Sequence, residues 1–346
     1  MHTDCICHYE RLTSTRKAGQ ADPPQGEKDD VKETHLDLVS LGETMATFVR
    51  ADTSDSYRLI TAGAESNVAA GMATLGCRTQ WHSRLGTDEL GAFVADALAA
   101  ARVDVVAERD PDRPTGTAVK EVSATGSRMR YYRAGSAASR LDLLDTGPAH
   151  NAARLHLTGV TPALSPENRE LIATLMSERG TGTSFDINYR PTLWSSAEHA
   201  ASVLIPLARS ADLVFIGDDE ARALLGSDDI NVVASAIGMR PSQELVLKRG
   251  PAAAELMTTD DRVTEPAHRV DVVDLTGAGD AFAAGYLAAS VWGWPARARL
   301  RLGHLLASRV VGVLGDTVPG IDRADLIQVA ADLGQSWPNP MEETQP

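Results

Sequence analysis

The sequence predicts an α/β fold in which one large, mostly parallel sheet is covered by helices on both faces. Two observations carry this prediction. From residue 36 onward, short apolar runs alternate with longer segments whose apolar residues recur every three or four positions. The chain has 346 residues, 43% of them hydrophobic, which is enough for a large core. Ligands of such folds bind beyond the carboxyl ends of the strands.

The elements follow in chain order from this pattern. The first expected helix, residues 63–75, shows the helical period and is ended by Gly76. Further helices are expected at 89–101, 166–179, 197–209 and 279–291. Strands are expected at 36–41, 154–157, 183–187, 213–216 and 245–247.

Two stretches interrupt the alternation and predict a second, smaller sheet. Residues 43–49 form one of them, and residues 117–122 with 129–133 form the other, without a helix between the last two strands. Polar residues interrupt these predicted strands, which is typical of a small antiparallel sheet. We expect this element, within residues 43–60 and 115–134, to form a lid over the site.

The ends of the chain are expected to lie outside the domain. Residues 1–34 mix Gly, Pro, Gln, Lys and Asp without apolar periodicity, which predicts a disordered tail. Residues 336–346 are expected to form a C-terminal tail. A single domain, residues 35–335, lies between them.

Charge and cysteine content exclude several classes of function. A net charge of −14 argues against nonspecific binding to nucleic acid or to anionic membranes. No window approaches the ~20 apolar residues that a membrane span needs, and no secretory signal is evident. With only 3 cysteines, a disulfide scaffold is excluded. We therefore expect a cytoplasmic protein that acts on small molecules, with locally placed cations for any anionic ligand.

The most informative segment is residues 273–282, Val-Asp-Leu-Thr-Gly-Ala-Gly-Asp-Ala-Phe. A glycine-rich turn entering an apolar helix presents unpaired amides, which bind anions. Asp280 beside a bound phosphate can accept the proton of an attacking hydroxyl, while the amides of Gly277, Ala278 and Gly279 stabilise developing charge. The alternative is an ordinary loop in which Asp280 only caps the helix.

The pattern Asp274-x-x-Gly-Ala-Gly-Asp280 resembles the C-terminal signature of the ribokinase-like (PfkB) carbohydrate kinases. The run Gly-Ala-Glu-Ser-Asn-Val-Ala from Gly63 resembles their sugar-contacting loop, and the resemblance covers about residues 36–320. It implies a three-layer sandwich with a small β lid, ATP and Mg²⁺ as cofactors, and Asp280 as catalytic base. It also places Gly63 and Asn67 near the sugar hydroxyls. Exposed edges of the lid strands further suggest a homo-oligomer, a dimer or higher.

Two further segments resemble those of 2-keto-3-deoxygluconate kinases, namely Tyr-Tyr-Arg-Ala-Gly-Ser from Tyr131 and Asp-Ile-Asn-Tyr-Arg-Pro from Asp186. The resemblance implies that Tyr131, Arg133 and Arg190 bind a sugar acid, with Arg190 also near the transferred phosphoryl group. A guanidinium binds a carboxylate as a forked, charge-assisted pair. Alternatively, Tyr131 packs as a strand residue and Arg190 pairs with Asp186 or another acid.

At two positions the sequence differs from related kinases in a way that bears on the choice of substrate. Ala118 stands where the 2-keto-3-deoxygluconate kinases often carry a tyrosine, so one substrate contact is expected to be missing or replaced. Thr47 stands where ribose and adenosine kinases usually carry a sugar-binding Asp, which argues against ribose and nucleosides.

The nucleotide side is expected along three segments. Glu220 matches the last residue of the family's Asn-x-x-Glu motif near the metal, although Gly217 replaces its Asn. Two acidic neighbours either compensate through water or form an acidic first helical turn, namely Asp218 and Asp219. Lys248 and Gly250 resemble a strand end that leads to the nucleotide, but Lys248 also fits a solvated cation. His304, in an expected helix at 302–313, stands where relatives often carry an adenine-side Asn.

Three hypotheses follow. The first is an ATP-dependent kinase that phosphorylates the primary hydroxyl of a 2-keto-3-deoxy sugar acid, either 2-keto-3-deoxygluconate or its galactonate epimer. The second is a neutral-sugar kinase of the fructose or ribose type. The third is a catalytically silent sugar-binding relative, against which the complete Gly-Ala-Gly-Asp turn argues.

Overall fold

The computed structural model describes residues 36–338, apart from 51–55, 124–125, 148–151, 180–181, 314 and 316–317. The expected tail at residues 1–34 and residues 339–346 of the expected C-terminal tail lie outside the described residues. Trp337, which falls in that C-terminal segment, packs against Trp292 in an edge-to-face arrangement, with ring centroids 4.7 Å apart.

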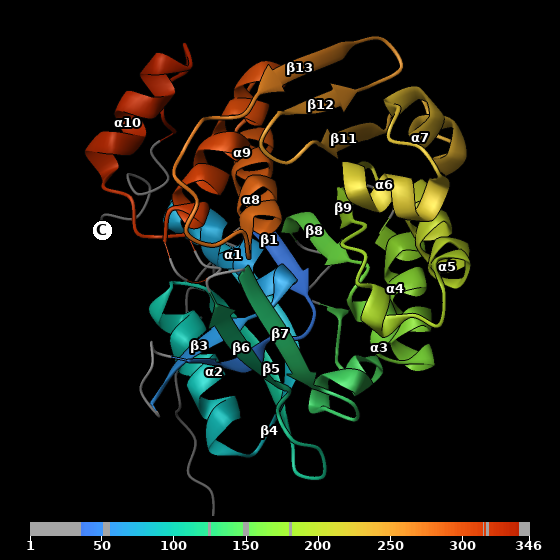
Figure 1. Ribbon diagram of the computed structural model, residues 1–346, viewed down its shortest axis with the longest axis vertical. Helices are drawn as coiled ribbons and strands as arrows, with labels where there is room; N and C mark the ends of the chain where they lie inside the picture. Colours follow the sequence, from blue (N-terminus) through green and yellow to red (C-terminus); the bar gives the residue numbers. More distant parts are fainter. Residues whose placement is uncertain are drawn as a thin grey trace, which may run out of the picture. The chain divides into compact units, whose positions relative to one another are not determined.

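The described strands and helices follow one another as sequence periodicity predicts, with additional elements between them (Figure 1). The strands are β1 (Leu36–Leu41), β2 (Met45–Arg50), β3 (Tyr57–Ala62), β4 (Thr79–Gly86), β5 (Asp104–Asp110), β6 (Thr117–Ser123), β7 (Gly126–Tyr132), β8 (Ala152–Thr158), β9 (Thr183–Asp186), β10 (Leu213–Gly217), β11 (Glu244–Lys248), β12 (Ala253–Met257) and β13 (Arg262–Pro266). The helices are α1 (Ala64–Thr74), α2 (Glu89–Ala100), α3 (Thr161–Leu164), α4 (Pro166–Arg179), α5 (Ala197–Ser210), α6 (Asp218–Leu225), α7 (Ile230–Ile237), α8 (Ala278–Val291), α9 (Ala296–Val311) and α10 (Arg323–Asp332), with short 3-10 segments η1 (Ala137–Leu143) and η3 (Pro191–Leu193).

The large sheet has the order β13-β12-β11-β10-β9-β8-β1-β4-β5. Every neighbouring pair from β11 to β5 is parallel, and only β12 and β13 add antiparallel pairs at one edge. The predicted mostly parallel sheet is therefore confirmed. The polar residues that follow β1, β8 and β9 consequently meet at one edge of the sheet.

Helices cover both faces of the large sheet, which confirms the three-layer sandwich (Figure 1). Successive residues of β1 enter different cores, because side chains of a strand alternate between its two faces. Leu38 packs in the core beneath α1, α8 and α9, and Val39 packs in the core beneath α4 and α5. None of the described helices combines the length and apolar character that a membrane crossing requires.

The small sheet has the order β3-β2-β6-β7 and is mixed rather than antiparallel. β2 pairs antiparallel with β3, and β6 pairs antiparallel with β7, but β2 and β6 are parallel. The prediction of a wholly antiparallel element was therefore wrong in this respect. The reason is the connection: between the two hairpins the chain passes through the large sheet, so they join side by side without a hairpin between them.

One helix boundary also differs from prediction. The helix expected at residues 302–313 begins at Ala296, six positions earlier, with Pro295 as its N-cap. Proline fits the start of a helix because it lacks the N–H that an interior position would need.

Candidate active site

A pocket lies where the carboxyl ends of the large sheet meet the small sheet and the N-termini of α1 and α8. It brings together residues that the sequence places far apart. Seven of the predicted site residues line it, namely Gly63, Asn67, Tyr131, Arg133, Arg190, Gly277 and Asp280.

Asp280 lies in the first turn of α8 and is 7% exposed. Its Oδ2 accepts a hydrogen bond of 2.9 Å from Nδ2 of Asn67, on α1. Its Oδ1 accepts a hydrogen bond of 3.3 Å from Nδ2 of Asn188, just after β9. Two amides from different elements thus fix the orientation of one carboxylate at the pocket wall.

Burial raises the pKa of Asp280, and the Asn67 hydrogen bond and the Arg190 charge oppose this rise only in part. A carboxylate with a raised pKa takes a proton more readily than an exposed one. Asp280 is therefore suited to act as a general base toward a hydroxyl in the pocket.

Asn188 has a left-handed backbone, with φ of 40°. Such a conformation is uncommon outside glycine, and strained residues of this kind cluster at functional sites. Within the described residues, no donor reaches its buried Oδ1. The side chain thus gives one hydrogen bond to Asp280 and keeps one acceptor available.

The turn before α8 has the geometry of an anion site. Gly277 is the N-cap of α8 and has φ of 78°, a conformation that favours glycine. The first amides of α8, beginning with Ala278 and Gly279, therefore have no partners within the helix. Nζ of Lys248 lies beside Gly279, at 3.4 Å from where a Cβ would stand.

Lys248, at the end of β11, belongs to a charged cluster next to this turn. Its Nζ donates a 2.6 Å bond to Oδ2 of the buried Asp186. Burial lowers the pKa of Lys248, but Asp186 and Glu220 outweigh this and leave it raised. The solvated-cation alternative for Lys248 is thus not what the structure shows, since the ammonium is held by an acid inside the site.

Glu220 lies in the first turn of α6, and both of its oxygens accept main-chain hydrogen bonds. Gly217 donates at 2.7 Å and Tyr189 donates at 2.8 Å. Burial raises the pKa of Glu220, and the nearby Asp186 adds to the rise. The buried site therefore disfavours a second negative charge beside Asp186, and a bound divalent cation would stabilise that charge on Glu220.

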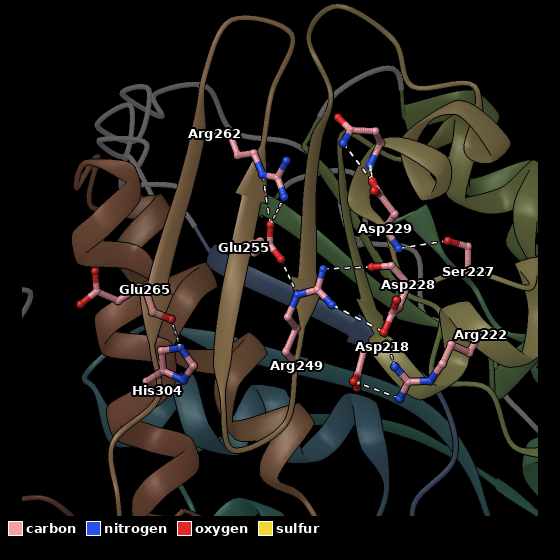
Figure 2. A network of polar contacts seen from close by, with 11 residues as sticks. Asp218, Arg222, Ser227, Asp228, Asp229, Arg249, Glu255, Arg262, Glu265 and His304 are labelled. Carbon is pink, nitrogen blue, oxygen red and sulfur yellow. Dashed lines mark hydrogen bonds and ion pairs between the residues drawn. The ribbon is translucent and has the colours of Figure 1, made fainter.

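Figure 2 shows two of the residues expected on the nucleotide side, His304 and Asp218, with their polar partners. His304 is 5% exposed and its Nε2 lies 3.0 Å from the carbonyl oxygen of Glu265, so that nitrogen is engaged inside the fold. Asp218 accepts a 3.0 Å bond from Arg222. Gly250 turns the chain after β11 with φ of 50°. The lining of the Asp280 pocket does not include Lys248, Gly250, Glu220 or His304.

The two arginines of the pocket differ in their partners. Arg133 donates from Nε to Oε2 of the buried Glu43 at 2.5 Å, and the other oxygen of Glu43 accepts from Ser136. Arg190 is exposed and, in the described part of the chain, no carboxylate lies within ion-pair distance of it. The alternative pairing with Asp186 is not seen, because Lys248 takes that partner.

Tyr131 lies on β7, is 41% exposed and lines the pocket. The guanidinium carbon of Arg133 lies 5.8 Å from the centre of its ring. Such a cation–π contact keeps the ring and the guanidinium side by side. Tyr131 is therefore a strand residue whose side chain is partly packed against Arg133 and partly exposed at the pocket.

Several residues of the site were not among those predicted. Asn188 and Glu43 each stand two residues after the end of a strand, β9 and β1, and that position was the available signal. Glu65 follows the pocket residues Gly63 and Ala64 but is fully buried. Its Oε1 accepts bonds of 2.7 Å from the hydroxyls of Thr158 and Thr161, and its Oε2 has no partner among the described residues.

The free energy of unfolding should report the titration of Glu65. Burial raises its pKa from 4.5 to about 7, so the folded state binds the proton more strongly than the unfolded chain. The stability that it contributes is present at low pH and is lost as the pH rises to about 7. Glu65→Gln stays neutral, so relative to wild type it should gain about 3 kcal/mol between about pH 4 and pH 8, at ~1.4 kcal/mol per pKa unit. Urea unfolding across that range measures the difference, and a constant difference would contradict the assignment.

The sequence and the fold of this chain are both similar to those of known carbohydrate kinases. The family model described as "pfkB family carbohydrate kinase" matches residues 35–323. The chain is 34% identical over 295 residues to 2-dehydro-3-deoxygluconokinase of Bacillus subtilis (strain 168), covering 81% of this chain and 91% of that protein. It is 33% identical over 315 residues to 2-dehydro-3-deoxygalactonokinase of Haloferax volcanii, covering 86% and 98%. Its fold is similar to the crystal structure of a PfkB protein from Polaromonas sp. JS666, with a TM-score of 0.73, 32% identity, and coverage of 81% and 97%.

Proposed function

Because the chain belongs to the pfkB family of carbohydrate kinases, we propose that it transfers the γ-phosphoryl group of ATP to the primary hydroxyl of a 2-keto-3-deoxy sugar acid. The gluconate and galactonate epimers are both included, since relatives named for each are similarly close to this chain. The observation that carries the proposal is the position of Asp280 at the start of α8, oriented by Asn67 and Asn188. It shares the pocket with Arg190, an arginine that pairs with no acid among the described residues.

The proposed reaction uses Asp280 as the base. The primary hydroxyl of the sugar gives its proton to Asp280 as its oxygen attacks the γ-phosphorus, and the bond from phosphorus to ADP breaks with the electron pair leaving on ADP. The amides at the start of α8, from Gly277 to Gly279, would stabilise the charge on the transferred group. Oδ1 of Asn188 can accept a hydrogen bond from a sugar hydroxyl.

The carboxylate of the substrate is assigned to Arg190, with Tyr131 as an additional donor. Arg190 supports this role because it is the lining cation that no carboxylate of the described residues pairs with. Arg133, in contrast, already shares its charge with Glu43, so it contributes N–H groups in a fixed orientation rather than net positive charge.

ATP and Mg²⁺ are assigned to the side of the turn that carries Lys248. No three metal-binding side chains gather among the described residues, and Mg²⁺ commonly arrives with nucleotide phosphates and water instead. The excess acid at Asp186 and Glu220 fits such a cation, with Glu220 acting through water because its oxygens already accept main-chain bonds. When bound, the ion would offset phosphate charge.

A neutral-sugar kinase of the fructose type is the second candidate. The pairing of Arg133 with Glu43 favours it, since one of the two arginines expected at a carboxylate is already compensated. Ala118, which stands where the 2-keto-3-deoxygluconate kinases often carry a tyrosine, also favours a neutral sugar. Only substrate preference separates the two candidates.

Substrate preference is measured as ADP release with Mg-ATP against 2-keto-3-deoxygluconate, its galactonate epimer, gluconate, fructose and ribose. We expect turnover with the two 2-keto-3-deoxy acids to exceed that with fructose by at least ~100-fold in kcat/KM, since a site built for a charged group discriminates strongly against its absence. A preference for fructose would support the second candidate. The lack of turnover with every sugar would favour a silent sugar-binding relative.

The remaining parts of the proposal concern the surroundings of the enzyme. We propose a cytoplasmic enzyme, in agreement with its acidic composition. We also propose a homo-oligomer that associates through the small sheet, whose outer strands β3 and β7 carry the exposed Tyr57 and Tyr132.

A further inference from the structure

A buried ion pair joins the small sheet to the anion-binding turn. Lys120 of β6 donates from Nζ to Oδ2 of Asp274, the first residue of the Asp-x-x-Gly-Ala-Gly-Asp pattern. The side chains are 3% and 4% exposed. A lysine buried to this degree on a strand of the smaller sheet is unusual, because its desolvation must be offset by a well-placed partner.

The pair is connected to the turn itself. Nζ of Lys120 also donates a 2.8 Å hydrogen bond to Oγ1 of Thr276, which lines the pocket next to Gly277. Asp274 accepts from the main chain of Thr276 at 3.1 Å and from its hydroxyl at 2.8 Å. The side chains of Asp274 and Thr276, which lie on either side of Leu275 at the entry to the turn, are therefore both bonded to one ammonium group. The main chain of Asp274 is also held by the carbonyl oxygen of Val311.

The same sheet face serves the sugar side of the pocket. Lys120 pairs in register with Met129, and Ala118 pairs with Tyr131, so these side chains share one face of the β6–β7 hairpin. Met129 and Tyr131 line the pocket, whereas Glu121 is exposed on the opposite face. One rigid hairpin thus contacts the site of the sugar and, through Lys120, the site of the phosphoryl group.

We propose that Lys120 is a positioning residue for phosphoryl transfer, which holds the anion-binding turn in place from the small sheet through Asp274 and Thr276. This inference rests on the proposed kinase function. It assigns to Lys120 no contact with the sugar or with ATP. Its removal should therefore lower kcat and leave the KM for the sugar nearly unchanged.

The test is a double-mutant cycle of Lys120→Met and Asp274→Asn. Each single variant leaves a buried charge without its partner and should lower the unfolding temperature, whereas the double variant removes both charges and should recover much of it. Turnover should behave differently. We expect each single variant and the double variant to lose roughly 10- to 100-fold in kcat, with non-additive losses, because the residues act on one turn.

The double variant separates the two roles of the pair. If the pair only stabilised the fold, the stability-restored double variant would recover the wild-type kcat, and that result would overturn the proposal. A change in the sugar KM in place of kcat would also overturn it. Arg130→Met is the matched control, because Arg130 lies on the outer face of the same hairpin, half exposed beside Glu121, and should keep wild-type turnover.

A second variant keeps the test decisive if the others fold poorly. Thr276→Val retains the ion pair and removes the hydroxyl that links it to the turn, so it should also lower kcat, and wild-type turnover by this variant would contradict the proposal. Absence of turnover by the wild-type enzyme with every sugar would reject the kinase function and this inference with it. Normal wild-type turnover together with an unaffected Lys120→Met variant would reject the inference alone.

Discussion

Asp280→Asn should lower kcat by at least ~100-fold, since general-base catalysis commonly contributes 10²–10⁴-fold. An amide cannot take the proton of the attacking hydroxyl, although it has the size of the carboxylate and its oxygen can still accept one of the two hydrogen bonds that Asn67 and Asn188 donate. The KM values for sugar and ATP should change little, because the lost interaction belongs to the transition state. The measurement is ADP release with Mg-ATP and the sugar that the wild-type enzyme prefers.

The control for this prediction is Asp325→Asn, the same exchange at an exposed position of α10 whose carboxylate lies 4.0 Å from Arg309. It should retain wild-type turnover. Circular dichroism and the unfolding temperature should show that Asp280→Asn is folded, because burial raises the pKa of Asp280 and a neutral amide is tolerated there. Turnover near the wild-type rate by the folded variant would remove Asp280 from the role of base.

Arg190→Met should produce the second large effect, a loss of roughly 10- to 100-fold in kcat/KM for the 2-keto-3-deoxy acid. Charge-assisted hydrogen bonds to a carboxylate contribute about 1.5–3 kcal/mol, which corresponds to a loss of this size. The loss should be much smaller for a neutral sugar, which has no carboxylate to bind. The measurement is kcat/KM of wild type and variant with an acid and with a neutral sugar, and the ratio of the two losses shows whether Arg190 binds the carboxylate.

Two outcomes would contradict this assignment of Arg190. Equal losses for acid and neutral substrates would place its guanidinium at the transferred phosphoryl group instead, and unchanged kinetics would show that it faces solvent. Arg222→Met is the matched control, since Arg222 is a half-exposed arginine that pairs with Asp218 on α6, away from the pocket. It should keep the wild-type preference for acids.

Many of the helices and strands could be predicted from the sequence, because hydrophobic periodicity is a local property of the chain. The helix predicted at 166–179 matches α4, and the strand predicted at 36–41 matches β1, since side-chain alternation and helical spacing are written into neighbouring residues. The strands β4 and β5 were not predicted. The parallel pairing of β2 with β6 was also beyond local reasoning, because it joins residues about 70 positions apart.

The sequence by itself determined the family, the glycine-rich turn and the acid at its end, because a turn that enters a helix requires particular residues at fixed spacing. Gly277 and Asp280 were found from this spacing, whereas Asn67 and Arg190 were implied by the family resemblance, and the structure brings all four to one pocket. Only the tertiary structure decided which charges remain available there. It pairs Arg133 with Glu43, Lys248 with Asp186, and Lys120 with Asp274. These partners lie 90, 62 and 154 positions apart in the chain. Whether a charged side chain binds a ligand or another residue depends on what folding places beside it, which residue spacing does not encode.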